Sequence, residues 1–253
     1  MKQSQAKKHD NAMTNKILMG LIALALGLLF LEILIIHSKN EQQKSASNQV
    51  QTARIMANGD LLYHDGLYMS ALQADGSYDF TENFTYVKPW LKQADLVLGD
   101  FEGTINPDYP LSGYPLFNAP QSVTAAIKDA GYDVMDLAHN HILDSGLEGA
   151  FTTADAFKKV GIDPIGVYEK PVRDKAPLLI KNVNGIKVAI LSYAYGYNGL
   201  ESNLTDKEVA DHLSNLDEKR MKAEIQRAEK EADITVIMPQ MGVEYRLEPT
   251  DEQ

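Results

Sequence analysis

The chain contains no cysteine. Disulfide bridges, thiolate zinc sites, iron–sulfur clusters and cysteine nucleophiles all require that side chain, so the sequence excludes all four. Positive charge is also scarce, because 24 Lys and Arg stand against 35 Asp and Glu and give a net charge of −11. A chain of this charge does not bind nucleic acid by neutralising phosphates. Any metal would have to be held by Asp, Glu, Asn or His.

The composition is that of a folded protein of moderate size. Hydrophobic residues make up 44% and charged residues 23% of the 253 residues, within the range of globular domains. Since domains usually contain roughly 100–200 residues, the length predicts one domain with an additional segment.

The additional segment is a long apolar run near the N-terminus. Residues 17–36 read ILMGLIALALGLLFLEILII, with Glu32 as the single charge, and about 20 apolar residues are enough to cross a bilayer as a helix. Lysines are concentrated before this run, so the positive-inside rule predicts a cytoplasmic tail (1–16), a single-pass anchor in the cell membrane (17–37) and an extracellular remainder. A cleaved signal peptide is the alternative, but its apolar region is normally only about 7–15 residues long.

Residues 38–52 are polar and contain almost no large apolar side chain. Such a segment cannot bury a core, so we expect a flexible tether that leads to a domain over residues 53–253. Acidic side chains outnumber basic ones by 33 to 20 beyond His37. The predicted extracellular part is therefore strongly acidic.

Short apolar runs alternate with helical periodicity along this domain, a pattern typical of an α/β fold. Asn184-Gly185 lies between two apolar runs and predicts a hairpin with a type I′ turn. Gly131 follows a helical stretch at the position where a left-handed residue ends a helix. The pattern predicts strands near 54–58, 95–98, 134–138, 178–183, 187–192 and 234–238, and helices near 84–93, 122–131, 147–160 and 217–232.

Three of these strands are followed by polar clusters: Gly59-Asp60, the 99–102 segment with Asp100 and Glu102, and the 139–141 segment His-Asn-His. Ligands of open α/β sheets bind at the carboxyl ends of the strands, so clusters far apart in sequence can meet there. Asp, Glu, Asn and His bind divalent Mn, Fe or Zn. Each cluster alone is also compatible with an ordinary turn. Their convergence at one edge is the hypothesis that the sequence supports.

The stretches around these clusters resemble a known family. IMANGD, ADLVLGDFEG, LFNAP, GYDVMDLAHNHILDSG and MPQMGVEY are similar to the motifs of CapA or PgsA capsule-synthesis proteins, whose domain is similar to calcineurin-like metallophosphoesterases. The resemblance extends from Ala53 to about Glu248. It implies an α/β, metallophosphoesterase-like layered sandwich of the αββα type.

The resemblance also implies roles for individual residues. Asp60 would be a metal ligand, Asp100 the carboxylate that bridges two metals, and Asn140 an amide ligand. His141 would be the catalytic histidine that protonates the leaving oxygen, a role suited to an imidazole beside two cations. Residues that would contact substrate or support the ligands are Glu102, His139, Gln240 and Glu244; a structural hydrogen bond is the alternative for Glu102 and Glu244.

Two departures from the family pattern affect the expected metal site. Gln240 stands where the family usually has histidine, and the family's later Gly-His-x-His segment is not in this sequence. We therefore expect a divalent metal to be weakly bound, and we expect a domain truncated at its C-terminus, with an incomplete sandwich.

The functional expectation follows from the resemblance. It implies a membrane-anchored extracellular protein that takes part in the synthesis, export or anchoring of an anionic capsule polymer such as poly-γ-glutamate. The expected partners are the membrane, the polymer and subunits of its synthetase, without nucleic acid. Two alternatives remain open: a metal-dependent phosphoesterase or cell-envelope polymer hydrolase, and a non-functional truncated remnant.

Overall fold

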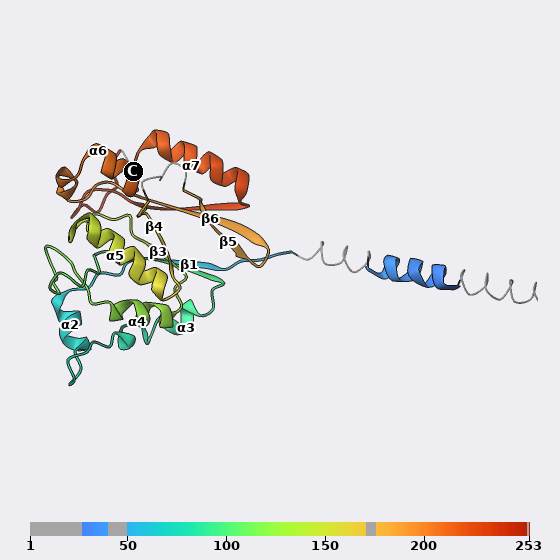
Figure 1. The fold of residues 1–253 in the computed structure, drawn as a ribbon, viewed down its shortest axis with the longest axis horizontal. Helices are drawn as coiled ribbons and strands as arrows, with labels where there is room; N and C mark the ends of the chain where they lie inside the picture. The colour runs from blue at the N-terminus through green and yellow to red at the C-terminus, as the bar shows by residue number, and fades with distance from the viewer. Residues whose placement is uncertain (1–26, 40–49, 171–175, 252) are drawn as a thin grey trace, which may run out of the picture. The chain divides into compact units, whose positions relative to one another are not determined.

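A computed structural model describes residues 27–39, 50–170, 176–251 and 253 (Figure 1). The chain divides into two compact units, Met1–Val50 and Gln51–Gln253. In the first unit, residues 27–39 form a helix with exposed side chains. The predicted tail (1–16), part of the predicted anchor (17–26) and most of the predicted tether (40–49) lie outside the described residues. In the described part of the chain, no helix combines the length and the apolar character needed to cross a membrane. The anchor therefore stays a prediction.

The larger unit, Gln51–Gln253, contains two β-sheets within the described residues. The strands of the first sheet are all parallel and have the order β1-β2-β3-β4. They are β1 (Ile55–Asp60), β2 (Leu96–Asp100), β3 (Val134–Asp136) and β4 (Asp163–Ile165). The strands of the second sheet are β5 (Leu179–Val183), β6 (Ile186–Ala194) and β7 (Ile234–Gln240), in that order. The α/β class predicted from the sequence is confirmed.

The second sheet begins with the predicted hairpin. β5 and β6 pair antiparallel, and β7 joins the other side of β6 in parallel. Asn184 and Gly185 connect β5 to β6 with φ angles of 53° and 90°. Two successive positive φ angles are what a type I′ turn requires, so the turn follows from these two residues.

The two sheets pack face to face through an apolar layer. Leu96, Leu98 and Val134 of the first sheet contact Val188 and Ile190 of the second sheet in one buried cluster. Side chains alternate between the two faces of a strand. The alternation that directs Leu98 and Val134 toward the second sheet also directs Asp100 and Asp136 toward it, at the carboxyl ends of β2 and β3.

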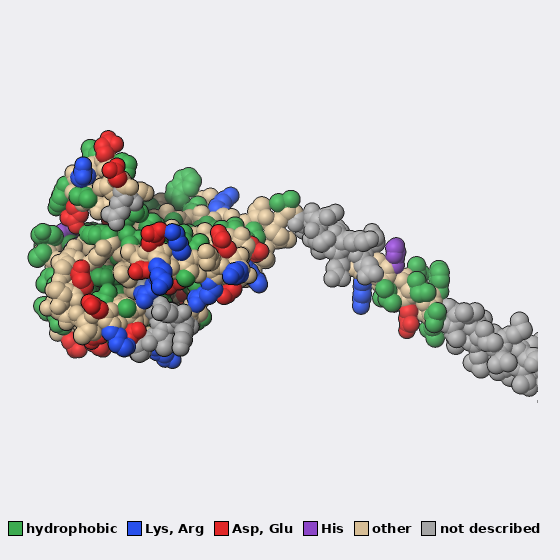
Figure 2. Space-filling view, turned by 90° about the horizontal axis from the view of Figure 1, so that it is seen from above, with side chains coloured by type: hydrophobic (Ala, Val, Ile, Leu, Met, Phe, Trp, Pro, Cys, Tyr) green, Lys and Arg blue, Asp and Glu red, His purple; other side chains and the backbone are tan. Residues whose placement is uncertain are grey.

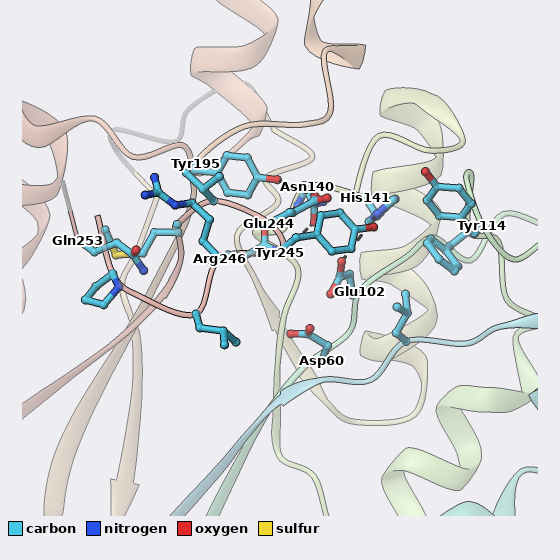
Figure 3. Close-up of a pocket in the computed structure, with 18 of the residues that line it drawn as sticks. Asp60, Glu102, Tyr114, Asn140, His141, Tyr195, Glu244, Tyr245, Arg246 and Gln253 are labelled. Atoms are coloured by element: carbon cyan, nitrogen blue, oxygen red, sulfur yellow. Dashed lines mark hydrogen bonds and ion pairs between the residues drawn. The ribbon is translucent and has the colours of Figure 1, made fainter. Parts of the chain in front are cut away.

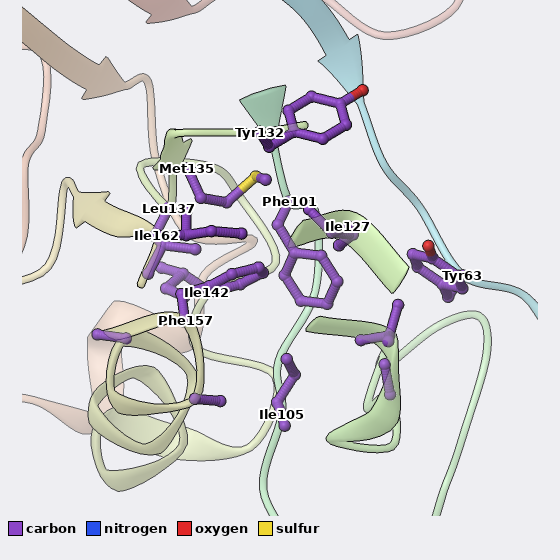
Figure 4. Close-up of a cluster of buried hydrophobic side chains, with 14 of the residues drawn as sticks. Tyr63, Phe101, Ile105, Ile127, Tyr132, Met135, Leu137, Ile142, Phe157 and Ile162 are labelled. Carbon is purple, nitrogen blue, oxygen red and sulfur yellow. The ribbon is translucent and has the colours of Figure 1, made fainter. Parts of the chain in front are cut away.

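Helices α4 (Ser122–Ala130) and α5 (Gly146–Lys159) cover the opposite face of the first sheet. Ile127 of α4 and Phe157 of α5 are fully buried there with Met135 of β3 (Figure 4). Phe101, directly after β2, meets Phe157 edge to face at a centroid distance of 5.1 Å. Gly131 ends α4 in the left-handed conformation, as predicted. Shorter elements complete this side: α2 (Asp65–Ala71), η1 (Thr81–Phe84) and α3 (Lys88–Leu91).

Helix α7 (Glu218–Glu231) covers the outer face of the second sheet. Ala228 is buried, and Met221 and Ile225 pack beside it against Ala189 and Leu191 of β6, so the helix predicted near 217–232 is present and packs through one apolar stripe. Figure 2 shows acidic and basic side chains interspersed on the surface of this unit seen from above. Within the described residues the order of layers is therefore helix, sheet, sheet, helix (Figure 1). The short elements η3 (Leu200–Asn203) and α6 (Asp206–His212) connect β6 to α7.

Several element boundaries differ from the sequence prediction. The helix expected over 84–93 is two short elements, η1 and α3. Strand β7 continues through Pro239, where we expected it to stop; a proline is tolerated in a strand at the edge of a sheet, because its missing N–H is not needed there. Strands β1 and β2 also continue to Asp60 and Asp100. The two Gly-Asp pairs are therefore part of the strands and not of turns after them.

Candidate functional site

Three aspartates lie in one row across the carboxyl ends of the first sheet. Asp60 is the register partner of Asp100, and Asp100 is the partner of Asp136. Neighbouring strands are about 4.8 Å apart, so these carboxylates are close neighbours. Like charges directly opposite each other on a sheet are destabilising. A row of this kind in the native state indicates that something other than folding stability selects the carboxylates.

Six of the predicted site residues line one cavity of about 670 Å³ at this edge, which we call the rim cavity (Figure 3). They are Asp60, Glu102, Asn140, His141, Gln240 and Glu244. The segments that contribute them are far apart in the sequence, from β1 to the residues after β7. The structure therefore brings these six side chains together. Tyr114, Tyr195 and Arg246 add aromatic and positively charged groups to the wall.

His141 is held from one side and faces a carboxyl group on the other. Its Nδ1 lies 2.7 Å from Oδ2 of Asp144, and its Nε2 lies 3.8 Å from Oε1 of Glu102. Asp144 is itself fixed, since the same Oδ2 accepts a hydrogen bond from the backbone N–H of Phe117 at 2.6 Å. Burial by itself lowers the pKa of His141, but the hydrogen bond and charge of Asp144, with the charges of Glu102 and Glu244, raise it above its usual value.

Asn140 is fixed by Gln240. The backbone N–H of Asn140 donates to Oε1 of Gln240 at 2.7 Å, and Nε2 of Gln240 donates to Oδ1 of Asn140 at 2.8 Å. Nδ2 of Asn140 donates to Oδ1 of Asn198 at 3.2 Å. The amide oxygen proposed as a metal ligand is therefore already a hydrogen-bond acceptor, and the loop after β3 is tied to the end of β7.

Two predicted residues do not line the rim cavity. His139 is buried below the loop, where its Nδ1 lies 3.2 Å from the backbone N–H of His141. Burial lowers the pKa of His139 to about 3, so the imidazole is neutral and supports the loop. Asp100 lines a second cavity of about 280 Å³, which we call the inter-sheet cavity; its walls also contain Asn58, Asp60, Asp136 and residues 238–240 of β7.

The buried carboxyl groups at this edge hold their protons unusually strongly. Burial, followed by the charges of Asp136 and Asp60, raises the pKa of Asp100 to about 9. Burial, followed by the charge of Asp60 and a hydrogen bond with it, raises the pKa of Glu102 to about 8. Burial also raises the pKa of Asp136. Perturbed pKa values of this kind concentrate at functional sites.

The expected two-metal site is not formed by the side chains as they stand. Among the described residues, no three His, Cys, Asp or Glu side chains are arranged so that they could hold a metal ion together. Asn140 is engaged by Gln240, and Asp100 lines a different cavity from Asn140 and His141. The set Asp60, Asp100 and Asn140 therefore does not fit a shared metal, and we derive no reaction step through one.

Sequence reasoning missed several residues of the site, Arg246 among them. Asp136 was taken only as part of a buried strand, although an aspartate at the end of an apolar run was a visible sign. Asn198 has a positive φ of 54°, and its Nδ2 lies 3.5 Å from His141; no local pattern links it to the 139–141 segment. Tyr114 reaches the rim cavity from a loop that sequence periodicity does not describe.

Two stacked sheets between helices, with polar cavities at the carboxyl ends of the parallel strands, define a layered α/β protein whose site lies at the strand ends. The sequence matches the family described as "Bacterial capsule synthesis protein PGA_cap" over residues 54–253. The chain belongs to this family, as its motifs led us to expect.

Two curated relatives agree with this assignment. The chain is similar to the capsule biosynthesis protein CapA of Bacillus anthracis, with 30% identity over 179 residues that make up 67% of this chain and 43% of the relative. It is also similar to the PGA biosynthesis protein CapA of Bacillus subtilis, with 25% identity over 249 residues, 97% of this chain and 63% of the relative. The chain thus spans less than two thirds of the length of either protein.

A solved structure shows a limited likeness. A Staphylococcus aureus protein provisionally described as a 5′-nucleotidase, crystallised in complex with alpha-ketoglutarate, has 13% identity and a TM-score of 0.48 over 78% of this chain and 39% of that one. A likeness of this degree carries no argument about function.

Proposed function

We propose that the protein takes part in the synthesis, export or anchoring of an anionic capsule polymer such as poly-γ-glutamate. Membership of the capsule synthesis family supports the process, and the name of the Bacillus subtilis relative supports the polymer. The observation that carries the proposal is the rim cavity, because it gives a family member of this kind a place to bind a polymer segment.

The chemistry of the rim cavity is compatible with a carboxylate ligand despite its acidic residues. Arg246 and His141 supply positive charge, and the raised pKa of His141 favours its charged form. Glu102 has a pKa of about 8 and therefore carries its proton near neutral pH. A protonated carboxyl group can donate a hydrogen bond to a polymer carboxylate, so Glu102 and His141 can bind one together.

We propose that residues 17–37 anchor the protein in the cell membrane, with the N-terminus in the cytoplasm and residues 51–253 outside, beside the subunits of a membrane-bound polymer synthetase. The apolar run and the distribution of lysines support this orientation. Protease added to intact cells should then digest the larger unit; protection of that unit would contradict the orientation.

The test of the proposed function is complementation of a gene deletion. We expect deletion to lower the amount of cell-associated capsule polymer, wild type to restore it, and His141→Ala to restore less than a tenth of it. The control is His212→Ala on α6, a histidine outside the rim cavity, which should restore it fully. Capsule that is unchanged by deletion, or restored fully by His141→Ala at equal protein level, would contradict the proposal.

A metal-dependent phosphoesterase or cell-envelope polymer hydrolase is the second candidate. The observation that favours it is the His141–Asp144 pair, because a histidine held by a carboxylate is a common proton donor in catalysis. An enzyme of this kind should bind close to two equivalents of Mn or Zn and hydrolyse a phosphodiester or envelope polymer. Both metal and activity should be lost on Asp100→Ala. Activity without any dependence on metal or on these residues would eliminate this candidate.

A further inference from the structure

A group of exposed apolar side chains lies at helix α3, outside both cavities. Tyr86, Val87 and Trp90 are 89%, 46% and 65% exposed, and Lys88 and Lys92 lie among them in the sequence. We call these five residues the aromatic patch. Single exposed apolar residues are common on protein surfaces, whereas a contiguous group rimmed by polar residues marks a surface that contacts another molecule or a membrane.

The exposure of these aromatic rings is imposed by the packing of their own segment. Phe84 is buried, and Leu91 packs against the same core. The backbone N–H groups of Trp90 and Leu91 both donate to the carbonyl oxygen of Val87, at 2.9 and 3.0 Å, so these residues form one helical turn. Residues three or four apart are neighbours on a helix surface. Trp90 therefore adjoins Tyr86 and Val87, while Phe84 and Leu91 hold the opposite side of the segment against the core.

The aromatic patch lies at the end of the larger unit where the chain enters it. This unit begins at Gln51, and the nearby Arg54 is bonded to the residues that follow Trp90. Nη1 of Arg54 donates to the carbonyl oxygen of Gln93 at 3.3 Å, and its backbone N–H donates to Oδ2 of Asp95 at 2.8 Å. In Figure 1, α3 lies toward this end of the unit and α2 toward the other. The rim cavity is at that other end, because it lies at the carboxyl ends of the same parallel strands.

The proposed anchor would keep this end of the unit near a bilayer. Only the chain from His37 to Gln51 separates the anchor from the larger unit. Even when fully extended, a chain of this length spans at most roughly 50 Å, at about 3.3–3.6 Å per residue. A short linker of this kind gives the surface beside Gln51 a high effective concentration at the headgroups.

We propose that the aromatic patch binds the headgroup region of the bilayer, an inference that rests on the proposed anchor. Trp and Tyr are enriched at membrane–water interfaces, because one part of each side chain is apolar and the other is polar. Lys92, and Lys88 in its ion pair with Asp129, supply the positive charge that anionic lipids attract. Bound in this way, the larger unit presents its opposite end, with the rim cavity, away from the bilayer.

The experiment uses the full-length chain in liposomes of phosphatidylcholine and phosphatidylglycerol, with and without a brominated phosphatidylcholine that quenches tryptophan. Trp90 is the single tryptophan of the chain, so the emission reports on the aromatic patch alone. We expect the brominated lipid to remove at least half of this emission. A chain that floats with the liposomes but is not quenched would overturn the aromatic patch as a lipid contact, in favour of a protein partner, and would leave the anchor intact. A chain that does not float would overturn both proposals.

Variants at the two ends of the larger unit test the position of the contact. Tyr86→Glu combined with Val87→Glu retains Trp90 and should reduce its quenching at least threefold, because both positions are exposed and would bring negative charge to the headgroups. The matched control is Met69→Glu on α2, which is 74% exposed and should leave the quenching unchanged. Equal quenching in the two variants would contradict the proposal.

Moving the reporter gives an independent measurement. Met69→Trp combined with Trp90→Phe places the single tryptophan on α2, where we expect no quenching by the brominated lipid. Quenching of this variant to the extent seen for Trp90 in the wild type would show that the larger unit contacts the bilayer without a preferred face, which would overturn the proposal.

Discussion

At the scale of single residues, the rim cavity depends on a small number of directed hydrogen bonds. Asp144 holds His141, Gln240 holds Asn140, and Asn198 contacts both held residues. Both held side chains belong to the 139–141 segment after β3. Gln240 and Asn198 come from distant parts of the chain, whereas Asp144 lies only three residues after His141. The orientation of Asn140 is therefore set by tertiary contacts, and that of His141 largely by a local one.

The first prediction concerns the protonation of His141. In the wild type we expect its pKa to lie above 6.5, because Asp144 outweighs the effect of burial. Asp144→Asn removes the charge but keeps the shape, so burial is opposed only by the charges of Glu102 and Glu244, and the pKa of His141 should fall below the wild-type value. NMR titration of the His141 ring protons measures both values. An unchanged pKa in Asp144→Asn would show that Asp144 does not control this histidine.

At the scale of elements, the strand ends matter more than the helices for the site. β1, β2 and β3 each end in an aspartate of the row, and β7 ends at Gln240, which ties the loop after β3 to the second sheet. Gly166, directly after β4, leaves room for this loop: a Cβ atom there would lie 2.6 Å from the backbone nitrogen of Ala138. The end of β4 and the start of the 139–141 segment are therefore packed backbone against backbone.

The second prediction uses two glycines that share a backbone conformation. Gly166 and Gly161 have φ angles of 92° and 76°, but a Cβ at Gly161 meets nothing within 4 Å. The free energy of unfolding of Gly161→Ala should therefore be lower than that of the wild type by only roughly 1–2 kcal/mol, which is the cost of an alanine in the left-handed conformation. The free energy of unfolding of Gly166→Ala should fall by that amount and by a further about 1–3 kcal/mol, because the new Cβ is overpacked against Ala138. Urea unfolding of both variants measures the difference. Equal losses of unfolding free energy in the two variants would mean that the backbone around Ala138 moves to accommodate the added methyl group at no measurable cost.

The elements also show where pattern recognition works. The Asn184-Gly185 turn and the helix near 217–232 were predicted because each depends on neighbours within a few residues. The region 84–93 was predicted as one helix and is two short elements. The helices α2 and α6 and strand β4 are short and were not predicted. A local signal for α6 was present, because Thr205 and Glu208 form a capping box at its start.

At the scale of the whole molecule, the larger unit concentrates buried carboxyl groups at one edge. Asp100, Glu102 and Asp136 are buried beside one another, and the pKa values of all three are raised. Stability at this edge is therefore linked to protons when no cation is present.

The third prediction is the pH dependence of stability in EDTA. Unfolded carboxyl groups release their protons near pH 4, whereas Asp100 and Glu102 keep theirs to about pH 9 and 8 in the native state. Between these values the native state binds more protons, so the free energy of unfolding should fall as the pH rises from 5 to 9. Each such proton contributes a slope of up to about 1.4 kcal/mol per pH unit.

Thermal unfolding of the full-length chain across this pH range measures the dependence. Asp100→Asn is the control, because it removes one titrating group and should flatten the curve. A stability that rises toward pH 9 in EDTA would show that these groups are not buried as described.

The sequence alone determined the family, the α/β class and the candidate residues of the rim, because motifs and local periodicity depend on residues near one another in the chain. Only the tertiary structure decided which of those residues meet. In the folded protein, Asp100 points toward the second sheet beside Asp136, and the amide oxygen of Asn140 accepts a hydrogen bond from Gln240. The physical reason is that strand register and side-chain alternation set the direction of a carboxylate, and both are fixed by pairing between strands that are far apart in the sequence.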